Sequence, residues 1–463
     1  MMDLKNKKVT VMGLGLHGGA LGNIEWLYSE GAVLTVTDMK TAKELAATVK
    51  KLKKFEGIKL VLGKHNDEDF TQADLIIRNP AVPRTSKYLQ LAKEAGIPIE
   101  MDSSLFFEFC PSKNIIGVTG SKGKTTTSNA IAVLLKARHP QTVAVGVDGV
   151  SPLKELSVIE PQNPVVFELS SWRLEALDEK KISPSVAVVT SLYRDHLNTY
   201  KSFKEYIETK KVLVKYQTEN DITLLNADDE RLRAWEKDIV SRLFWYSAHD
   251  LKTGNGIFVR NTMITVRLQD GEHELFSIDE LPFQSEHERR NVLPGILIAL
   301  LHAVPIITIQ KTLNALQRLP HRLEVVRELD SVTYINDSAA TMPDATIAAL
   351  KAFTGKSIVH ILGGSDKALL FEELAAIEAQ QTIRALVFLP GTATDKIKEL
   401  VVDAFKDKPA TYDAKTMPEA VELARLAAQP GDTILLSPGA TSFGLFQHEF
   451  DRGDQFRKAV LAL

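Results

Sequence analysis

The sequence is poor in three features that would each indicate a specialised class of protein. One cysteine, Cys110, in 463 residues excludes an internal disulfide, and we expect it to fill a place at a core edge. The formal net charge of −3 gives no basic excess to favour nucleic acid or an anionic membrane surface. No apolar run approaches the roughly 20 residues that cross a bilayer, and MMDLKNKK precedes an expected strand without the apolar region of a signal peptide. We therefore expect a soluble cytoplasmic protein.

The length and the apolar patterns predict the domain organisation. A chain of 463 residues is too long for one core and suggests three domains of about 150 residues each. Apolar β-branched runs alternate with helical patterns, which predicts parallel sheets flanked by helices. We expect three consecutive α/β domains with largely parallel sheets, at residues 1–100, 101–318 and 319–463.

Two stretches of the central region depart from this alternation. Short alternating runs over residues 242–280 predict a β-hairpin annex. An apolar helix is expected over residues 288–303, interrupted by Pro294 and Gly295.

The stretch GVTGSKGKTTTSN, residues 117–129, has the features of a phosphate-binding loop. It follows an apolar strand pattern and opens into a helix pattern, so its backbone N–H groups and the helix dipole would favour an anion. Lys124 adds a cation, and Thr125 stands where a P-loop hydroxyl binds the Mg²⁺ of a nucleoside triphosphate. The spacing Gly120-x-x-Gly123 is shorter than usual, and a loop that only caps a helix is the alternative. The order of strand, glycines, lysine, threonine and helix favours the phosphate site.

A second glycine turn lies in a strand–helix–strand pattern over residues 9–38. Gly13, Gly15 and Gly18 match G-x-G-x-x-G, and Asp38 ends the next strand pattern about twenty residues on. Taken alone, this pattern indicates a dinucleotide-binding enzyme. It is weak evidence for NAD, because any ligand with a diphosphate would use the same turn and helix N-terminus.

Polar side chains end two further strand patterns of the central region. PVVFELSS places Glu168 at a carboxyl end, and VAVVTSL leads to His196. Because parallel strands end at one edge of a sheet, we expect this carboxylate and imidazole beside the phosphate loop, where they could ligate a second metal. A capping or core histidine is the alternative for His196. Lys210 and Lys211 follow on a helix pattern and could equally form a solvated face.

The last third of the chain has three strand patterns that each end in small or polar residues. Their ends are Asn336-Asp337-Ser338 with Thr341, Gly363-Gly364 with Asp366 and Lys367, and Ser437-Pro438-Gly439-Ala440-Thr441-Ser442. Ordinary turn chemistry would explain any one of these ends, but it explains three in one domain less well. Together they predict a polar rim that suits an anionic small molecule.

Several ordered motifs carry a resemblance that covers essentially the whole chain. They are TGSKGKTTT, ELSSWRLE, DHLNTY, LNADD, HRLEVV, NDSAATMPDAT, LGGSDK, and LLSPGATSFGLF followed by DRGDQF. With these motifs the chain resembles the Mur ligases, most closely the branch that adds D-glutamate to UDP-N-acetylmuramoyl-L-alanine. The resemblance implies Rossmann-like N- and C-terminal domains flanking a P-loop ATPase-like central domain. It also assigns the first glycine turn to a uridine diphosphate instead of NAD.

The resemblance implies ATP-dependent amide formation with Mg²⁺ as cofactor, in peptidoglycan precursor synthesis. ATP would convert the carboxylate of the UDP-sugar-L-alanine to an acyl phosphate, and the amino group of the incoming amino acid would displace phosphate. The expected partners are these two small-molecule substrates, with no nucleic acid and no membrane insertion, and the expected state is a monomer.

The motifs carry over the family's site residues by position. The ATP site would contain Gly120, Ser121, Lys122, Gly123, Lys124, Thr125, Thr126, Asn291, Arg322 and Asp337. The substrate sites would contain Gly15, Leu16, His17, Asp38, Asn79, Asp148, Ser170, Thr341, Lys367, Ser442 and Phe446. The catalytic residues would be Lys124, Glu168, His196 and Lys210, and the metal ligands would be Thr125, Glu168, His196 and Lys210. Lys210 matches the lysine that the family carbamylates to make a metal-bridging carboxylate, and Tyr206 supports this register, although Lys211 leaves a one-residue ambiguity.

The substrate ends of the chain depart from the family pattern. Asp148 stands where an asparagine is expected, Ala339 replaces a lysine, and Gly444 replaces an aspartate. The stretch before the central helix, QSEHERRN, keeps only the histidine and the second asparagine of G-x-H-N-x-x-N. A sister ligase that adds L-glutamate or another amino acid is therefore an open alternative. A nucleotide-sugar-binding protein without turnover and an NAD-dependent oxidoreductase are alternatives from other classes, and the intact ATP and metal residues argue against the first of these.

Overall fold

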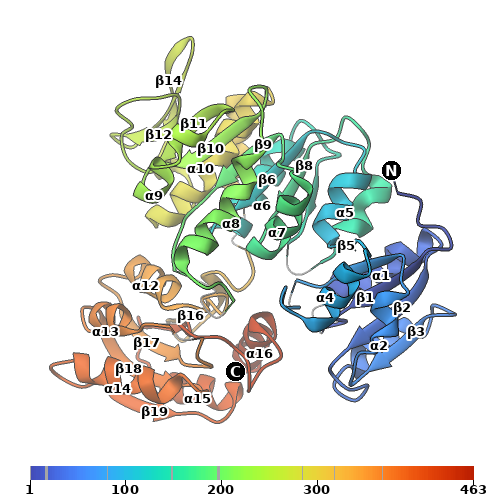
Figure 1. Ribbon diagram of the computed structural model, residues 1–463. Helices are drawn as coiled ribbons and strands as arrows, with labels where there is room; N and C mark the ends of the chain where they lie inside the picture. The colour runs from blue at the N-terminus through green and yellow to red at the C-terminus, as the bar shows by residue number, and fades with distance from the viewer. Residues whose placement is uncertain are drawn as a thin grey trace. The chain divides into compact units, whose positions relative to one another are not determined.

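The protein forms two compact units, Met1–Leu316 and Gln317–Leu463. The computed structural model describes residues 2–15, 19–80, 82–147, 150–194, 199–283, 285–316, 319–367 and 369–463. The first unit contains two sheets and the second contains one, and helices flank each sheet (Figure 1). Most strand pairs are parallel, which confirms the expected α/β fold class. Among the described residues, no helix is long and apolar enough to span a bilayer.

The N-terminal sheet is parallel throughout, in the order β3-β2-β1-β4-β5. Its order reverses at β1, and the crevice at the carboxyl ends beside such a strand is where α/β sheets bind ligands. Both the first glycine turn, after β1, and the loop after β4 lie at this crevice. The strands are β1 (Lys8–Met12), β2 (Val33–Asp38), β3 (Lys59–Leu62), β4 (Leu75–Arg78) and β5 (Ile99–Glu100), and the helices are α1 (Gly19–Ser29), α2 (Ala46–Leu52), α3 (Glu68–Thr71) and α4 (Lys87–Glu94).

The central sheet has nine strands in the order β14-β13-β12-β11-β10-β9-β6-β8-β7. The pairs from β7 to β12 are parallel, and β12, β13 and β14 form an antiparallel edge that projects at the top of Figure 1. This edge contains the expected hairpin, whereas β11 continues the parallel sheet. The strands are β6 (Ile115–Thr119), β7 (Val143–Val145), β8 (Val165–Glu168), β9 (Val186–Val189), β10 (Ile222–Asn226), β11 (Arg242–Ser247), β12 (Gly256–Arg260), β13 (Met263–Leu268) and β14 (Gly271–Ser277).

The alternating side chains of β6 reach two hydrophobic clusters. Ile115 belongs to one cluster, and Ile116 and Val118 belong to the other. β6 is therefore buried on both faces, and its end, which carries the phosphate loop, lies between the ends of β8 and β9. The helices around this sheet are α5 (Asp102–Phe109), α6 (Lys124–Lys136), α7 (Ser171–Lys180), α8 (Phe203–Lys215), α9 (Glu230–Arg233), α10 (Glu286–Leu301) and α11 (Ile306–Asn314), with short 3₁₀ helices η1 (Pro152–Val158), η2 (Glu236–Asp238) and η3 (Ile278–Glu280).

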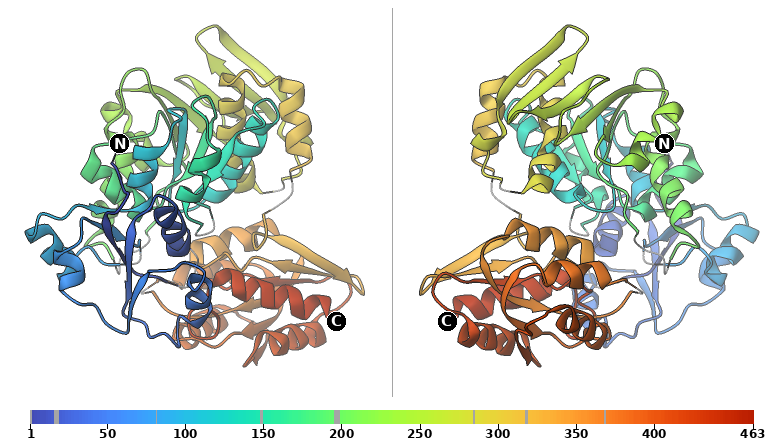
Figure 2. Two further views of the ribbon diagram at one scale, coloured as in Figure 1. Left: turned by 90° about the vertical axis from the view of Figure 1, so that its right-hand side faces the viewer. Right: turned by 90° about the vertical axis from the view of Figure 1, so that its left-hand side faces the viewer.

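The expected interruption of the helix at Pro294 and Gly295 is wrong, because α10 runs unbroken through both residues. α10 packs along α6, as the yellow and teal helices of Figure 2 show. A Cβ atom on Gly295 would come within 3.2 Å of backbone atoms of Ala130 and Ile131, so glycine allows this close approach. Packing against a buried neighbour thus overrides the local preference of proline to break a helix.

The second unit contains a six-stranded sheet in the order β15-β16-β20-β17-β18-β19. Only the β15–β16 pair is antiparallel among its described strands. The strands are β15 (Glu324–Leu329), β16 (Val332–Asn336), β17 (Ser357–Leu362), β18 (Thr382–Phe388), β19 (Ala410–Asp413) and β20 (Thr433–Leu436). The helices are α12 (Pro343–Ala352), α13 (Glu372–Glu378), α14 (Thr394–Ala404), α15 (Met417–Ala427) and α16 (Glu449–Leu461).

A chain of buried polar groups crosses this unit from α13 to the end of β16. The ring of His360 lies between Glu378 and Ser437: its Nδ1 is 2.8 Å from Glu378 Oε1, and its Nε2 is 2.9 Å from the Ser437 carbonyl oxygen. The Ser437 hydroxyl donates to Asp337 Oδ2 at 2.8 Å, and the Leu323 N–H donates to Oδ1 at 3.2 Å. Burial raises the pKa of Asp337 to about 7, although these hydrogen bonds oppose the rise.

The raised pKa of Asp337 predicts how stability depends on pH. An aspartate in an unfolded chain titrates near pH 4, so between about pH 4 and pH 7 the folded chain keeps a proton that the unfolded chain has lost. The stability that this bound proton contributes is complete below about pH 4. It falls as the pH rises from 4 and is lost once the pH has passed 7. Asp337→Asn should therefore gain unfolding free energy over the wild type by up to about 1.4 kcal/mol per pH unit across this window.

Calorimetric unfolding of the full chain at pH 5 and pH 8 measures this difference. A stability difference between Asp337→Asn and the wild type that is the same at both pH values would contradict the raised pKa.

Candidate functional site

The phosphate loop connects β6 to α6 and depends on two glycines. A Cβ atom on Gly120, whose φ is +150°, would overlap the Thr190 hydroxyl. A Cβ atom on Gly123, at φ +88°, would lie 2.6 Å from Asn291 Oδ1. α6 begins at Lys124, so the N–H groups of its first turn, including those of Thr125 and Thr126, lie at the loop. The local structure is a turn that can accept a phosphate at a helix N-terminus.

Two lysines converge on the carbonyl oxygen of Gly120. Lys124 Nζ donates to this oxygen at 3.1 Å and to the Ser121 carbonyl oxygen at 3.4 Å, and Lys210 Nζ donates to Gly120 O at 2.9 Å. Lys210 is only 1% exposed, and its Nζ lies 4.7 Å from the centre of the Tyr206 ring. Lys211 points elsewhere and pairs with Asp238 at 2.6 Å. Of the two adjacent lysines, Lys210 is the one at the phosphate loop.

The loop is tied to the segment that follows β9. Ser121 N–H donates to the Ser191 carbonyl oxygen at 2.8 Å, and Lys122 N–H donates to the Ser191 hydroxyl at 3.0 Å. The Ser121 hydroxyl donates to the Tyr193 carbonyl oxygen at 3.1 Å and lies 3.3 Å from Tyr206 Oη. These hydrogen bonds fix the conformation of the loop against the segment after β9.

Glu168 ends β8, beside Val118 of β6. Its Oε2 atom is buried and has no hydrogen-bond partner among the described residues. Burying a carboxylate oxygen without a hydrogen-bond partner costs folding free energy. A divalent cation bound to this oxygen would offset that cost.

The donors near Glu168 fit Mg²⁺ bound together with a nucleotide. Mg²⁺ usually takes one or two carboxylates and completes its shell with phosphate oxygens and water, and Thr125 would add a hydroxyl. Across the described ranges, no group of three or more His, Cys, Asp and Glu side chains could hold a metal by itself. His196, the other expected ligand, lies outside the described residues.

The N-terminal turn is held by groups that the sequence analysis assigned to the substrate. Asp38 Oδ2 accepts the N–H groups of Leu14 at 2.8 Å and Gly15 at 3.1 Å, and Asn79 Nδ2 donates to the Gly13 carbonyl oxygen at 3.2 Å. Gly13 and Gly15 both have positive φ, at +92° and +62°. Leu16 and His17 lie outside the described residues.

Ser170 and the segment before Asp148 meet at Arg173. The Ser170 hydroxyl accepts the Arg173 N–H at 3.3 Å and caps α7. Arg173 Nη1 donates to the Gly146 carbonyl oxygen at 2.7 Å, and Nη2 pairs with Asp102 at 2.8 Å. Asp148 itself lies outside the described residues.

In the second unit, the loops that follow β16, β17 and β20 meet at one sheet edge. The Gly439 N–H donates to the Ala340 carbonyl oxygen at 3.0 Å, next to Thr341, and Ser365 N–H donates to Thr441 O at 2.8 Å. Ser442 Oγ is buried and has no partner within the described ranges, so it is a candidate ligand contact.

Three further residues of this unit were expected to bind ligands, and they lie in different local surroundings. Phe446 is mostly buried within a hydrophobic cluster, whereas Lys367 is half-buried on the loop after β17. Arg322 follows a turn in which its N–H donates to Leu319 O at 3.2 Å.

Sequence reasoning missed Arg452, which holds these loops together. The side chain is fully buried, and it donates to Ser338 O at 2.8 Å, Ser338 Oγ at 2.9 Å and Ala440 O at 3.1 Å. Burial lowers its pKa to about 9. The motif DRGDQF contains Arg452, so the signal was present, but no local pattern showed which loops it would bind.

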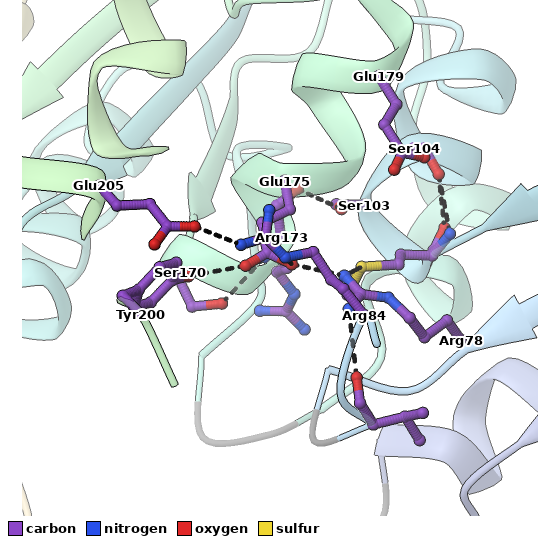
Figure 3. A network of polar contacts seen from close by, with 12 residues as sticks. Arg78, Arg84, Ser103, Ser104, Ser170, Arg173, Glu175, Glu179, Tyr200 and Glu205 are labelled. Carbon is purple, nitrogen blue, oxygen red and sulfur yellow. Dashed lines mark hydrogen bonds and ion pairs between the residues drawn. The ribbon is translucent and has the colours of Figure 1, made fainter. Parts of the chain in front are cut away.

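A second missed group joins the N-terminal and central sheets. It centres on Glu175 of α7, which contacts Arg78 and Tyr200 (Figure 3). These residues are far apart in the sequence, so spacing could not predict their contact.

Mur ligase family models match three consecutive stretches of the chain. The "Mur ligase MurD-like, N-terminal domain" matches residues 7–100, the "Mur ligase middle domain" residues 118–299, and the "Mur ligase, glutamate ligase domain" residues 321–439.

Curated relatives align over the full chain. A UDP-N-acetylmuramoylalanine–D-glutamate ligase of Roseiflexus sp. is 39% identical, with 99% of both chains covered. Proteins of the same name from Symbiobacterium thermophilum and Borreliella burgdorferi are 34% and 32% identical, each with 99% of this chain and 98% of the relative covered.

Solved structures share the fold at lower identity. UDP-N-acetylmuramate-alanine ligase of Thermotoga maritima aligns with a TM-score of 0.63 at 18% identity, covering 99% of this chain and 100% of that one. A MurF ligase of the same organism in complex with ADP aligns with a TM-score of 0.57 at 16% identity, covering 99% and 96%. Because relatives above 30% identity span its whole length, the protein belongs to the Mur ligase family.

Proposed function

We propose that the protein is an ATP-dependent ligase that joins D-glutamate to UDP-N-acetylmuramoyl-L-alanine in peptidoglycan precursor synthesis. The observation that carries this proposal is the phosphate loop, where Lys124 and Lys210 meet at Gly120 O, together with the buried Glu168 oxygen that has no partner among the described residues. The shared name of the full-length relatives supports the choice of substrates. We assign the UDP-sugar to residues 1–100, ATP to residues 101–318 and the amino acid to residues 319–463, in a cytoplasmic monomer.

The reaction makes an amide from a carboxylate in two steps. The terminal phosphoryl group of ATP passes to the L-alanine carboxylate, which gives an acyl phosphate and ADP. The amino group of D-glutamate then attacks the acyl carbon, and phosphate leaves from the tetrahedral intermediate. Lys124 and the N–H groups at the start of α6 bind the phosphates and stabilise their charge in the transition state. Bound Mg²⁺, held by Glu168 and Thr125, would neutralise phosphate charge.

The family's lysine carbamate is assigned here to Lys210. The Lys210 ammonium group would first lose one proton. The neutral amine would then add to CO₂ and release a second proton, which converts a buried cation beside Gly120 into a carboxylate that can bind metal. The half-buried side chain of Lys211 pairs with Asp238 away from the phosphate loop, so we give that residue no such role.

The proposed reaction predicts phosphate release that requires all the substrates. ATP, Mg²⁺, UDP-N-acetylmuramoyl-L-alanine and D-glutamate together should release phosphate, and omission of any substrate should abolish the release. L-glutamate serves as the matched alternative because Ala339 and Gly444 alter the amino-acid end of the family pattern. Turnover with L-glutamate but not with D-glutamate would overturn the assigned specificity and keep the ligase class.

The two adjacent lysines predict opposite effects of the same substitution. Lys210→Met should lower kcat by about 100-fold or more, because it removes a group that acts on transition-state charge. Lys211→Met should stay within about threefold of the wild type, because its half-buried side chain pairs with Asp238 and not with the phosphate loop. In ¹³C-bicarbonate buffer, a carbamate carbon signal should be present in the wild type and in Lys211→Met and absent from Lys210→Met.

Equal activity of the two lysine variants would contradict the assignment of Lys210 to the site. A carbamate signal that disappears with Lys211→Met instead would reverse the register.

A further inference from the structure

Glu175 forms a buried ion-pair centre between the N-terminal and central sheets (Figure 3). It lies on α7, and its side chain is 4% exposed. Arg78 Nη2, at the end of β4, donates to Glu175 Oε2 at 2.8 Å, and Tyr200 Oη donates to Oε1 at 2.9 Å. Arg84 Nε lies 3.6 Å from Oε2, and the same arginine pairs with Glu205 of α8 at 2.9 Å. One carboxylate therefore contacts two cations of the N-terminal domain and one phenol of the central domain.

The Arg78 side of this centre leads to the first glycine turn. Arg78 Nη1 donates to the Val82 carbonyl oxygen at 3.2 Å, which fixes the loop that follows β4. A Cβ atom on Gly13 would lie 3.0 Å from both Asn79 Cβ and Val82 Cγ2, so this loop packs directly against the turn. Asn79, the neighbour of Arg78, donates to the Gly13 carbonyl oxygen at 3.2 Å. A shift of Arg78 would therefore move the groups that shape the UDP-binding turn.

The Tyr200 side leads to the phosphate loop. Burial raises the pKa of Tyr200, so its phenol stays protonated and donates to Glu175. The Tyr200 and Tyr206 rings pack with their centres 5.4 Å apart. Tyr206 in turn lies beneath the Lys210 ammonium group, and its Oη is 3.3 Å from Ser121 Oγ. Tyr206 thus connects the Glu175 centre to both a loop residue and a catalytic lysine.

We propose that Glu175 is a positioning residue that couples the UDP-sugar site to the ATP site. Each contact in the path is a hydrogen bond, an ion pair or a ring contact between buried or half-buried groups, so a change at one turn displaces packed neighbours and is not absorbed by solvent. The inference rests on the proposed function, because it takes the two ligands to be a UDP-sugar and ATP. It assigns to Glu175 the property that occupancy of one site changes affinity at the other.

The test measures this coupling by calorimetry on the full chain. The Kd for UDP-N-acetylmuramoyl-L-alanine is measured alone and with a saturating non-hydrolysable ATP analogue, and the ratio of the two values is the coupling. For the wild type we expect a ratio of about fivefold or more. Glu175→Gln keeps the size of the side chain and removes its charge, so it should bring the ratio close to one. In steady state the same variant should raise KM for the UDP-sugar by about tenfold and change kcat less.

Two further variants separate coupling from folding. Tyr200→Phe removes only the hydroxyl that bonds Glu175 and should also lower the ratio, which keeps the test decisive if Glu175→Gln fails to fold. Glu179→Gln is the matched control, because Glu179 lies on the same helix and makes an exposed 4.0 Å pair with Lys93 of the N-terminal domain. It should leave the ratio unchanged.

Each outcome decides the proposal. A wild-type ratio of one, or a ratio unchanged in Glu175→Gln and Tyr200→Phe, overturns the coupling role and leaves the proposed function intact. Equal loss of the ratio in Glu179→Gln also overturns it, because the effect would then belong to the interface as a whole. If the wild type binds no UDP-sugar, the proposed function fails and the coupling role fails with it.

Discussion

The structure of the candidate site depends on the carbonyl oxygen of Gly120, which accepts hydrogen bonds from both Lys124 and Lys210. Two amino groups converge there, and one of them is almost completely buried. The phosphates of a nucleotide bound at the loop would lie beside Lys124, whose ammonium group would stabilise their charge. Glu168 lies at the end of the neighbouring strand with a buried oxygen that has no partner among the described residues, which suits a cation bound with those phosphates. These observations support our proposal that the site binds a metal–nucleotide complex.

The sheets explain how such a convergence is reached. β6 lies between β8 and β9, so the phosphate loop, Glu168 and the segment after β9 share one edge. α10 packs closely against α6 at Gly295. This contact helps to fix the position of α6, whose N-terminus forms part of the phosphate loop. In the second unit, β16 and β20 pair in parallel, and Arg452 joins the Ser338 and Ala440 loops that follow them. In both units, backbone geometry sets the place of a loop and a buried long side chain fixes its shape.

The sequence predicted the features that depend on local patterns. Strand and helix periodicity located the sheets. The glycine spacing located both turns, because the described glycines of these turns have positive φ angles that other residues rarely adopt. The course of α10 through Pro294 was not predictable, since packing on α6 decides it. The choice between Lys210 and Lys211 required the structure, because it depends on which side of α8 lies against the phosphate loop. Glu175 and Arg78 are separated by 97 residues, and no local sequence pattern around either residue predicts their contact.

The most direct test of the central claim is the effect of Lys124→Ala on ATP binding and phosphate release, compared with Lys136→Ala at the exposed end of the same helix. If Lys124 holds the phosphates at Gly120, its loss should weaken ATP binding and reduce phosphate release by about 100-fold or more, while the Lys136 variant behaves as the wild type. Unchanged ATP affinity and phosphate release in Lys124→Ala would contradict the account.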